Sequence, residues 1–460
     1  MKLTFRGAAG TVTGSRILFD HHHFKGLVDC GLFQGPRDFR QLNWLDQPDL
    51  NQAQCVLLTH AHIDHSGYLP RLYKNGFRGP IYCSAPTSDL LPIMLLDAAK
   101  LQEEDAYFAN KIRHSRHDPA LPLYQEVDAL GCNRLIHATP WNEWTPLSES
   151  LSFRLSRSGH ILGSAYIQLA ATNSNSSKIV TFSGDLGSPS PPILREAEAI
   201  QNTDVLVVES TYGNRALPRT NVSENLALVI NKVIGRGGTL IIPAFSVGRT
   251  QDLLYLISQL KKKQHIKSCP VYLDSPMAHR VTEVYLKNLP ELKEDFTGND
   301  IEEALGKAVF KPTLSPDDSM LLCMSDEPKI VISASGMLQG GRVLHHLKMK
   351  LPHEKNGVLF VGYQGMGTKG RLLKDGLTKI RLHHTDVDVE AEIFSIDGLS
   401  AHADSNEIIA WLQRFQQEPE LTLINHGEPE ASQALAYRIT HELGWKNVRR
   451  PELNETFDLS

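Results

Sequence analysis

Short apolar runs of strand length dominate the first part of the chain. Residues 16–19, 26–28 and 55–58 form three such runs, and each gives way to a polar or glycine-rich loop. Residues 88–115 instead carry apolar side chains at three- and four-residue spacing, which predicts an amphipathic helix. Strand-like runs resume after about residue 135 and continue to 205–208, so strands predominate in this part.

From about Thr211 the pattern changes to strands that alternate with helices. Buried strands are predicted at 239–242, 271–273, 329–332 and 357–361, with helices between them. Such alternation is typical of a parallel sheet covered by helices. After about residue 379 the short strand-like runs of the first part of the chain return. The chain, with 460 residues, is also long for one domain. We therefore predict an α/β protein with a discontinuous first domain, 1–210 and 374–460, and an inserted α/β domain, 211–373.

Charge alone does not identify a substrate. The net charge of −5 argues weakly against a polyanionic partner, because like charges repel. Two basic clusters depart from that average, and each taken alone predicts a solvated face. The first comprises Lys111, Arg113, His114, Arg116 and His117, and the second comprises Lys369, Arg371, Lys374, Lys379 and Arg381.

Other features bear on the compartment. No apolar run approaches the roughly 20 residues needed to cross a bilayer, and the N-terminus lacks the apolar segment of a secretory signal. The six cysteines are widely spaced and form no C-x-x-C pair, which favours reduced thiols over disulfides or a cysteine zinc site. We therefore predict a cytoplasmic protein without membrane contact. A homodimer is the default if it oligomerises.

The densest chemical signal is a group of histidines and an aspartate at one strand-to-loop turn. His60, His62, Asp64 and His65 place four potential ligands within six positions. Imidazole and carboxylate are the usual ligands of a hydrolytic zinc ion. The alternative is that these are ordinary polar residues of a loop. Four potential ligands within six positions favour metal binding over that alternative. By contrast, the run at 21–23 is predicted to be the exposed tip of a hairpin.

The spacing His-x-His-x-Asp-His resembles the signature of the metallo-β-lactamase superfamily, and its other motifs follow in order. Asp29, in Leu-Val-Asp-Cys-Gly, matches the first motif, while Ser-Gly-His160 and Phe-Ser-Gly-Asp185 match later ones. The resemblance implies an αββα sandwich that holds two zinc ions. One zinc would be bound by His60, His62 and His160 and the other by Asp64 and His65, with Asp185 bridging both. Asp29 would orient a ligand from behind.

Three further motifs resemble those of the β-CASP group, the branch that processes nucleic acids. They centre on Glu209, His402 and His426. The resemblance implies that the insertion is a β-CASP domain, that His426 completes the second zinc site, and that Glu209 pairs with His402. A histidine at the last motif accompanies members that act on RNA, whereas DNA-acting members tend to have valine. The stretches 397–404 and 32–35 resemble those of short bacterial relatives of the messenger RNA 3′-end cleavage factor. The chain is expected to lack the C-terminal domain of ribonuclease J and the KH domains of archaeal relatives.

The resemblance also implies a mechanism for phosphodiester hydrolysis. A hydroxide that bridges the two zinc ions would be the nucleophile, and the metals would stabilise charge on phosphorus. His402 would protonate the departing oxygen. Glu209 would aim His402 and keep it protonated, because a nearby carboxylate raises the pKa of a histidine. Asp64 can orient the hydroxide while it binds metal. A purely structural pair is the alternative for Glu209 and His402.

Several loops that join a predicted strand to a predicted helix are suited to phosphates, because backbone N–H groups and a helix N-terminus attract anions. The candidate substrate-binding residues there are Ser246, Gly248, Arg249, Ser333, Ser335 and Gly336. Plain turn chemistry is the alternative for each loop. The stretch 363–371 is similar to another family segment, but it has Gly365-Met366 where the family more often has Ala-Glu.

The leading hypothesis is a zinc-dependent ribonuclease that cuts single-stranded RNA, as an endonuclease, a 5′–3′ exonuclease or both. A DNA nuclease of the same fold is one alternative. A catalytically inactive RNA-binding scaffold is another, although such copies usually lose ligands that this chain retains. A small-molecule hydrolase such as a thioesterase is a third, and a domain-sized insertion is hard to explain for that task.

Overall fold

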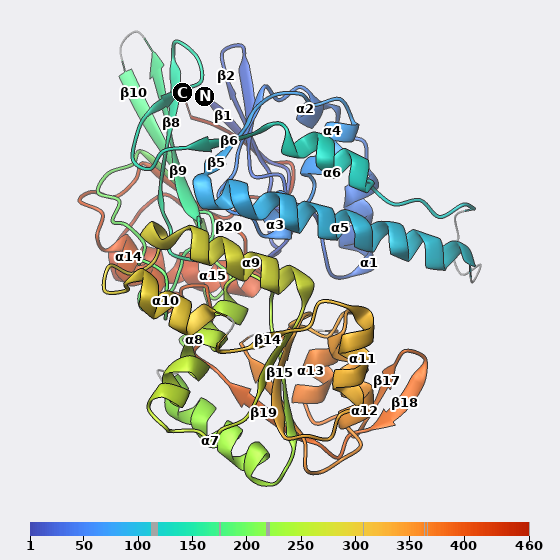
Figure 1. Cartoon of the computed structure of the whole chain (residues 1–460). Helices are drawn as coiled ribbons and strands as arrows, with labels where there is room; N and C mark the ends of the chain where they lie inside the picture. Colours follow the sequence, from blue (N-terminus) through green and yellow to red (C-terminus); the bar gives the residue numbers. More distant parts are fainter. Residues whose placement is uncertain are drawn as a thin grey trace. The chain divides into compact units, whose positions relative to one another are not determined.

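The computed structural model describes residues 1–111, 118–173, 176–217, 221–306, 308–362, 364–365 and 367–459. The chain forms two compact units (Figure 1). Unit 1 comprises Met1–Ser190, Glu196–Ala216 and His402–Ser460, and unit 2 comprises Pro191–Arg195 and Leu217–Ala401. The first unit is therefore discontinuous in sequence.

Unit 1 contains two seven-stranded sheets. The first has the order β22-β1-β2-β3-β4-β5-β6, with strands Thr456–Asp458, Lys2–Phe5, Ile17–His21, Phe24–Val28, Cys55–Leu57, Ile81–Ser84 and Ile136–Thr139. The second has the order β21-β20-β11-β10-β9-β8-β7, with strands Val448–Arg449, Leu421–Asn425, Val205–Glu209, Ser176–Phe182, Ala165–Asn173, Leu151–Arg157 and Thr145–Pro146.

The main core of unit 1 lies between these two sheets. Phe5, Phe19 and Leu57 of the first sheet belong to one buried cluster with Phe153 and Ile167 of the second. Helices cover the outer faces. On the second sheet, α14 (Ser405–Leu412) and α15 (Pro429–Arg438) contribute to a separate core with β11 and β20. The long helix α5 (Ala85–Lys111) packs on β5 and β6 (Figure 1). The predicted αββα sandwich is confirmed.

The remaining helices of unit 1 are short. They are α1 (Arg37–Gln41), α2 (Pro48–Asn51), α3 (Ile63–Ser66), α4 (Leu69–Lys74) and α6 (Glu126–Asn133). α3 and α4 are separate helices, because the chain turns at Gly67 and Tyr68 after the residues that carry the histidine motif.

Unit 2 is built on a six-stranded sheet of the order β14-β13-β15-β12-β16-β19. Its strands are Lys311–Pro312, Val271–Asp274, Lys329–Ser333, Thr239–Pro243, Gly357–Val361 and Glu392–Ile396, and all neighbouring pairs are parallel. β12, β15 and β16 are buried along their whole length, as expected for strands with helices on both faces. The predicted inserted α/β domain is confirmed.

Seven helices of the described chain belong to unit 2. They are α7 (Val222–Gly235), α8 (Arg249–Lys262), α9 (Pro276–Lys287), α10 (Gly298–Leu305), α11 (Pro316–Met324), α12 (Val343–Lys350) and α13 (Lys369–Lys374). A separate hairpin consists of β17 (Lys379–Leu382) and β18 (Thr385–Asp388).

The boundary predicted at 373/374 differs from the structural one. Unit 2 continues to Ala401, because β19 adds to the parallel sheet beside β16, from Gly357↔Glu392 to Val361↔Ile396. The short strand-like runs after residue 379 therefore belong to the β17–β18 hairpin and to an edge strand of unit 2. They do not mark a return to unit 1. At the other boundary, unit 1 extends to Ala216 and not to residue 210.

The histidine run at 21–23 was predicted to be wholly exposed, and this is wrong for its first member. His22 and His23 are exposed at the turn between β2 and β3, whereas His21 ends β2 with a buried ring. All six cysteines are buried and unbonded to one another. Among the described residues, no helix combines the length and the apolar character that a membrane-spanning helix requires.

Candidate metal centre

The turn that carries His60 to His65 is fixed by backbone hydrogen bonds to neighbouring loops of unit 1. It follows β4 and runs into α3. Ser15 N donates to the Asp64 carbonyl at 2.8 Å, and Cys30 N donates to the His65 carbonyl at 2.7 Å. His60 and His65 are fully buried, whereas His62 and Asp64 are half-buried. A rigid turn of this kind can aim all four side chains at one space.

The first group of potential ligands consists of His60, His62, His160 and Asp185. The Nδ1 atom of His62 lies 3.1 Å from Nε2 of His60 and 3.2 Å from Nε2 of His160. Asp185 Oδ2 lies 3.5 Å from each of those Nε2 atoms. Donors held tetrahedrally by zinc at about 2.1 Å lie about 3.4 Å apart. These four separations, of 3.1 to 3.5 Å, are close to that value, so the donor set fits a zinc ion.

The second group consists of Asp64, His65 and His426. Nε2 of His426 lies 3.1 Å from Nε2 of His65 and 3.6 Å from Oδ2 of Asp64. The other oxygen of Asp185, Oδ1, lies 3.3 Å from Nε2 of His65. Asp185 thus directs one oxygen toward each group. The structure brings together all seven residues predicted to bind metal.

Strand direction explains why residues far apart in sequence meet here. β10, β11 and β20 are neighbours and parallel, so their carboxyl ends lie at one edge of the second sheet. Asp185 follows β10, Glu209 ends β11 and His426 follows β20 directly. His160 comes from the turn between β8 and β9, where its backbone N donates to Ser164 Oγ at 2.9 Å.

The electrostatics of the first group suit a cation. Burial lowers the pKa of His60 well below its ordinary value and lowers the pKa of His62 to about 4, so both rings are neutral at pH 7. Burial alone would raise the pKa of Asp185, but the surrounding histidines hold it well below its usual range. Asp185 Oδ1 is buried, meets no hydrogen-bond criterion among the described residues and lies 3.3 Å from His65 Nε2 and from His426 Nδ1. The neutral imidazoles of His60 and His62 beside the carboxylate of Asp185 form a donor set that fits a metal ion.

Asp29 lies directly behind His65. The Nδ1 atom of His65 is 2.7 Å from Asp29 Oδ2, and Asp29 also accepts hydrogen bonds from Thr59 N and Ser15 Oγ at 2.9 and 3.2 Å. Burial would lower the pKa of His65, but Asp185 and Asp29 raise it well above its ordinary value. A metal at Nε2 would displace a proton from that nitrogen, while Nδ1 would keep its proton and donate it to Asp29. Asp29 thus lies where a ligand-orienting residue is predicted.

Glu209 and His402 form a pair beside the two groups. Nδ1 of His402 lies 3.3 and 3.2 Å from the two carboxylate oxygens of Glu209. Glu209 is held by Leu186 N at 2.5 Å and Thr211 N at 3.3 Å. Burial opposes a charge on His402, but Glu209 and Asp185 outweigh it and raise its pKa to about 9. His402 is therefore protonated at neutral pH, and 21 % of its side chain is exposed.

Two supporting residues were not predicted from the sequence. Thr59 Oγ1 contacts Asp29 and the ring of His60, and Thr211 Oγ1 lies 3.2 Å from Nδ1 of His426. Thr59 immediately precedes His60 in the sequence, and Thr211 follows Glu209 by two positions. Adjacency to a motif is the one sequence signal that could have indicated them.

The predicted phosphate loops lie in unit 2, at the carboxyl ends of β12 and β15. Ala244 N donates to the Ser333 carbonyl at 3.1 Å, so the two loops contact each other. Ser246 and Arg249 are buried, and Gly248 is the N-cap of α8. The Ser333 hydroxyl donates to the Asp274 carbonyl at 3.0 Å, so it supports the neighbouring strand. Ser335 and Gly336 follow in the β15–α12 loop. Phosphate binding by these residues stays a prediction.

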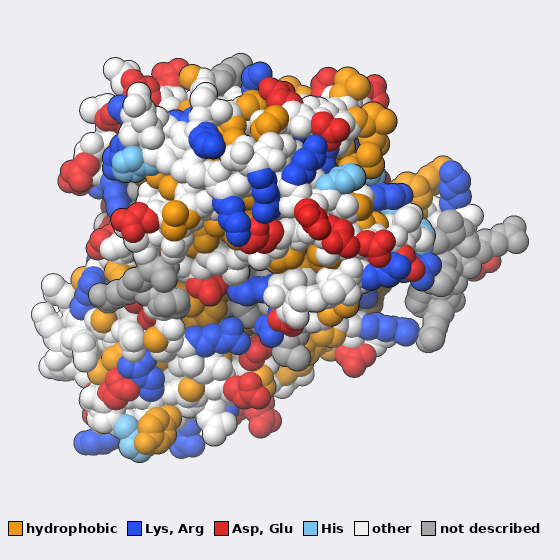
Figure 2. Space-filling model, turned by 90° about the horizontal axis from the view of Figure 1, so that it is seen from below, with side chains coloured by type: hydrophobic (Ala, Val, Ile, Leu, Met, Phe, Trp, Pro, Cys, Tyr) orange, Lys and Arg blue, Asp and Glu red, His pale blue; other side chains and the backbone are white. Residues whose placement is uncertain are grey.

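The basic cluster of α13 and β17 is largely neutralised within unit 2. Arg371 pairs with Asp375 at 2.7 Å, Lys374 with Asp397 at 3.4 Å, and Lys379 with Asp388 at 3.3 Å. In the other cluster, Lys111 is exposed, and residues 113–117 lie outside the described residues, as do positions 363 and 366 of the stretch 363–371. On the face drawn in Figure 2, Lys and Arg side chains are intermixed with Asp and Glu.

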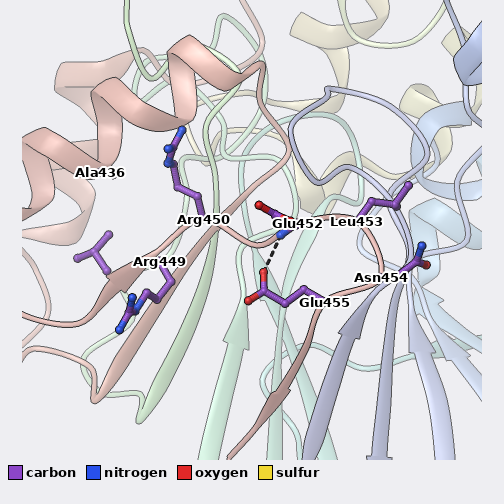
Figure 3. Close-up of a pocket in the computed structure, with 8 residues that line it drawn as sticks. Ala436, Arg449, Arg450, Glu452, Leu453, Asn454 and Glu455 are labelled. Atoms are coloured by element: carbon purple, nitrogen blue, oxygen red, sulfur yellow. Dashed lines mark hydrogen bonds between the residues drawn. The ribbon is translucent and has the colours of Figure 1, made fainter.

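A cavity of about 730 Å³ lies elsewhere in unit 1, between α15 and the chain that follows β21 (Figure 3). It is lined by Ala436, Val448, Arg449, Arg450, Glu452, Leu453, Asn454 and Glu455. Glu452 N donates to Glu455 Oε2 at 2.8 Å across one part of its wall. Its lining carries both signs of charge and includes none of the metal-site residues.

The fold and the ordered histidine and aspartate set define a metallo-β-lactamase-type protein. Residues 26–222 match the model of the beta-lactamase superfamily domain, 250–373 the Beta-Casp domain, and 386–451 the Zn-dependent metallo-hydrolase RNA specificity domain. The chain is 32% identical over 444 residues to ribonuclease TTHA0252 of Thermus thermophilus, covering 95% of each protein. The chain belongs to the β-CASP family of metallo-β-lactamase-fold proteins, and the predicted membership is confirmed.

Other similarities agree with this membership. The chain is 30% identical over 458 residues to the transcription termination factor FttA of Cenarchaeum symbiosum, covering 95% of this chain and 68% of that protein. It is 28% identical over 441 residues to FttA of Methanocaldococcus jannaschii, covering 93% and 67%. A crystal structure of a protein of unknown function from Enterococcus faecalis aligns over 99% of both chains, with a TM-score of 0.53 and 13% identity. That likeness concerns the fold alone.

Proposed function

We propose that this protein is a zinc-dependent ribonuclease that holds two zinc ions in unit 1. The observation that carries this proposal is Asp185, whose two oxygens face two separate groups of potential ligands. His60, His62 and His160 would complete one site, and Asp64, His65 and His426 the other. Zinc bound there would supply Lewis-acid stabilisation of a phosphodiester and a nucleophile from water at neutral pH.

The residues around the ligands would perform the remaining steps. His402 is held with its Nδ1 against Glu209, and its Nε2 would offer a proton to the departing oxygen. Its pKa of about 9 keeps that proton in place at neutral pH. Asp64 is half-buried and lies next to His426, so it is placed to orient the attacking water as well as to bind metal. Asp29 would keep Nε2 of His65 directed at the metal.

RNA is the proposed substrate class. The relative with 32% identity is named a ribonuclease, and the family model over 386–451 is named for RNA specificity. His426, at the last family motif, also favours RNA over DNA. We propose that the loops at 246–249 and 333–336 in unit 2 bind backbone phosphates of single-stranded RNA. A homodimer and a cytoplasmic location stay predictions.

The decisive experiment combines metal analysis with cleavage. The purified chain would be loaded with zinc, its metal content measured, and end-labelled RNAs with 5′-monophosphate, 5′-triphosphate and 5′-hydroxyl ends supplied together with matched DNA. We expect about two zinc ions per chain and cleavage of the RNA. The product lengths would separate endonuclease from 5′–3′ exonuclease action.

The His402→Ala variant provides the control. It should retain both metals but lose cleavage by about 10²–10⁴-fold, the range for a general acid. Cleavage of DNA alone by the wild-type protein would favour the DNA nuclease. Binding of RNA without cleavage by metal-loaded protein would favour an inactive scaffold and contradict the proposal.

A further inference from the structure

Thr59 occupies an unusual place behind the metal centre. It is buried two residues after the end of β4 and immediately precedes His60. Its hydroxyl oxygen lies 2.9 Å from Asp29 Oδ1 and 3.0 Å from His60 Nδ1. His60 belongs to the first group of ligands. Asp29 supports His65, which belongs to the second group. One hydroxyl therefore contacts a ligand of the first group and the residue that supports a ligand of the second.

The protons in this contact can be assigned from the donor inventory. His60 directs Nε2 toward the first group, so its ring proton must be on Nδ1, which donates to Thr59 Oγ1. The Thr59 hydroxyl has one proton, and the carboxylate of Asp29 can only accept it. The chain of donors therefore runs from His60 through Thr59 to Asp29.

Asp29 then stands behind one ligand of each group. It accepts the Nδ1 proton of His65 directly at 2.7 Å and that of His60 through Thr59. Thr59 Oγ1 is also 3.4 Å from Nδ1 of His65, but the much shorter contact assigns that proton to Asp29. Both rings are thereby held in the tautomer that leaves Nε2 free for a metal.

We propose that Thr59 is a positioning residue that couples the two metal sites, so that loss of its hydroxyl weakens metal binding at both. The inference rests on the two-metal centre proposed above. Removal of the hydroxyl leaves the Nδ1 proton of His60 without an acceptor and takes one donor from the buried carboxylate of Asp29. Supporting contacts of this kind typically change metal affinity by about 10–100-fold.

A purely structural role for Thr59 makes a different prediction. Its backbone accepts a hydrogen bond from Ala165 N at 2.8 Å and donates one to Asp29 Oδ1 at 2.9 Å, and neither requires the hydroxyl. Thr59→Val retains the shape and the backbone contacts and loses only the hydroxyl. Thr59→Ser retains the hydroxyl and loses only a methyl group. The two variants therefore separate shape from hydrogen bonding.

The test measures metal binding by the full-length protein, without RNA. Zinc and cobalt affinities would be obtained by competition with a chelator, and the cobalt absorption spectrum would report on each site. Thr181→Val is a matched control, since Thr181 is a buried threonine of the same unit whose hydroxyl donates to Thr203 at 2.8 Å. We expect both affinities to fall about 10–100-fold in Thr59→Val and to be unchanged in Thr59→Ser and in the control.

Several outcomes would overturn the inference. These are wild-type affinity at both sites in Thr59→Val, a loss at one site alone, or wild-type protein that binds only one ion. If Thr59→Val does not fold, the histidine ¹⁵N spectrum of zinc-loaded wild-type protein decides, because the proposal requires the His60 proton on Nδ1. A wild-type protein that binds two ions but leaves RNA intact would refute the ribonuclease proposal and leave this test valid.

Discussion

Replacement of Glu209 by glutamine gives a sharp test of the proposed proton donor. The substitution preserves size but removes the charge that faces Nδ1 of His402 at 3.2 Å. A hydrogen bond between charged groups contributes about 1.5–3 kcal/mol. Since one pKa unit corresponds to about 1.4 kcal/mol, loss of that bond should lower the pKa of His402 by about one to two units from its value of about 9.

The direction of the effect on activity follows from the role of His402. The protonated ring is the active form of a general acid, so cleavage by the wild-type protein should fall as the pH rises through the pKa of His402. In Glu209→Gln that alkaline limb should move about one to two pH units lower, since the imidazolium loses its carboxylate. Initial rates of RNA cleavage by zinc-loaded protein, measured across the pH range, would show the shift.

A matched control is available in the same unit. Glu198 pairs with Arg157 at 2.9 Å, where both side chains are half-buried, so Glu198→Gln makes the same chemical change without contacting His402. It should leave the alkaline limb in place. An unchanged limb in Glu209→Gln, with normal metal content, would refute the assignment of His402 as the acid that Glu209 tunes.

Three further predictions concern metal loading and stability. Gly31→Ala would place a methyl group onto the carbonyl of Asp64, so we expect lower zinc content and a lower Tm; Gly340→Ala, at an open position, should change neither. Arg16→Met should lower the free energy of unfolding in urea by about 2–4 kcal/mol, because the fully buried guanidinium donates to three acceptors that would lose this donor; a change below about 0.5 kcal/mol would contradict this. Asp274→Ala should lower the free energy of unfolding in urea by about 3–5 kcal/mol, because it leaves the half-buried guanidinium of Arg342 and the buried ring of His346 without their carboxylate partner. Although burial disfavours its charge, hydrogen bonds hold the pKa of Asp274 below its ordinary value, so its stabilisation should be present above about pH 4 and be lost as the pH falls through the folded-state pKa.

The metal centre was accessible from the sequence because its signals are local and ordered. His60 to His65 lie on one turn, and Asp185, Glu209 and His426 each end a strand-like apolar run. Ends of parallel neighbouring strands meet at one sheet edge, so their order along the chain was enough to predict that they converge. The parallel sheet of unit 2 was equally accessible, because its central strands are continuously apolar.

The sequence could not show which strands pair with one another or which side chains pack together. β19 has the pattern of a strand, but only its hydrogen bonds to β16 assign it to unit 2, and these join residues 35 positions apart, such as Gly357 and Glu392. The burial of His21, the last residue of β2, likewise depends on the side chains that pack around it, and its neighbours in sequence do not identify these. The role of Thr59 needs Asp29, His60 and His65 in three dimensions, because a threonine beside a motif carries no pattern of its own.

The pairing of β22 with β1 has a consequence for how the protein is made. Residue Lys2 pairs with Asp458, and β20 pairs with β11, so strands made early are completed by strands made more than 200 residues later. Until residues after 402 leave the ribosome, two sheet edges of unit 1 stay unpaired and prone to misassociation. The continuous segment of unit 2, Leu217–Ala401, emerges during that interval. Since His426 belongs to the final segment, complete ligation of the second ion would have to wait for the chain to close, and capture of that metal would mark the end of folding.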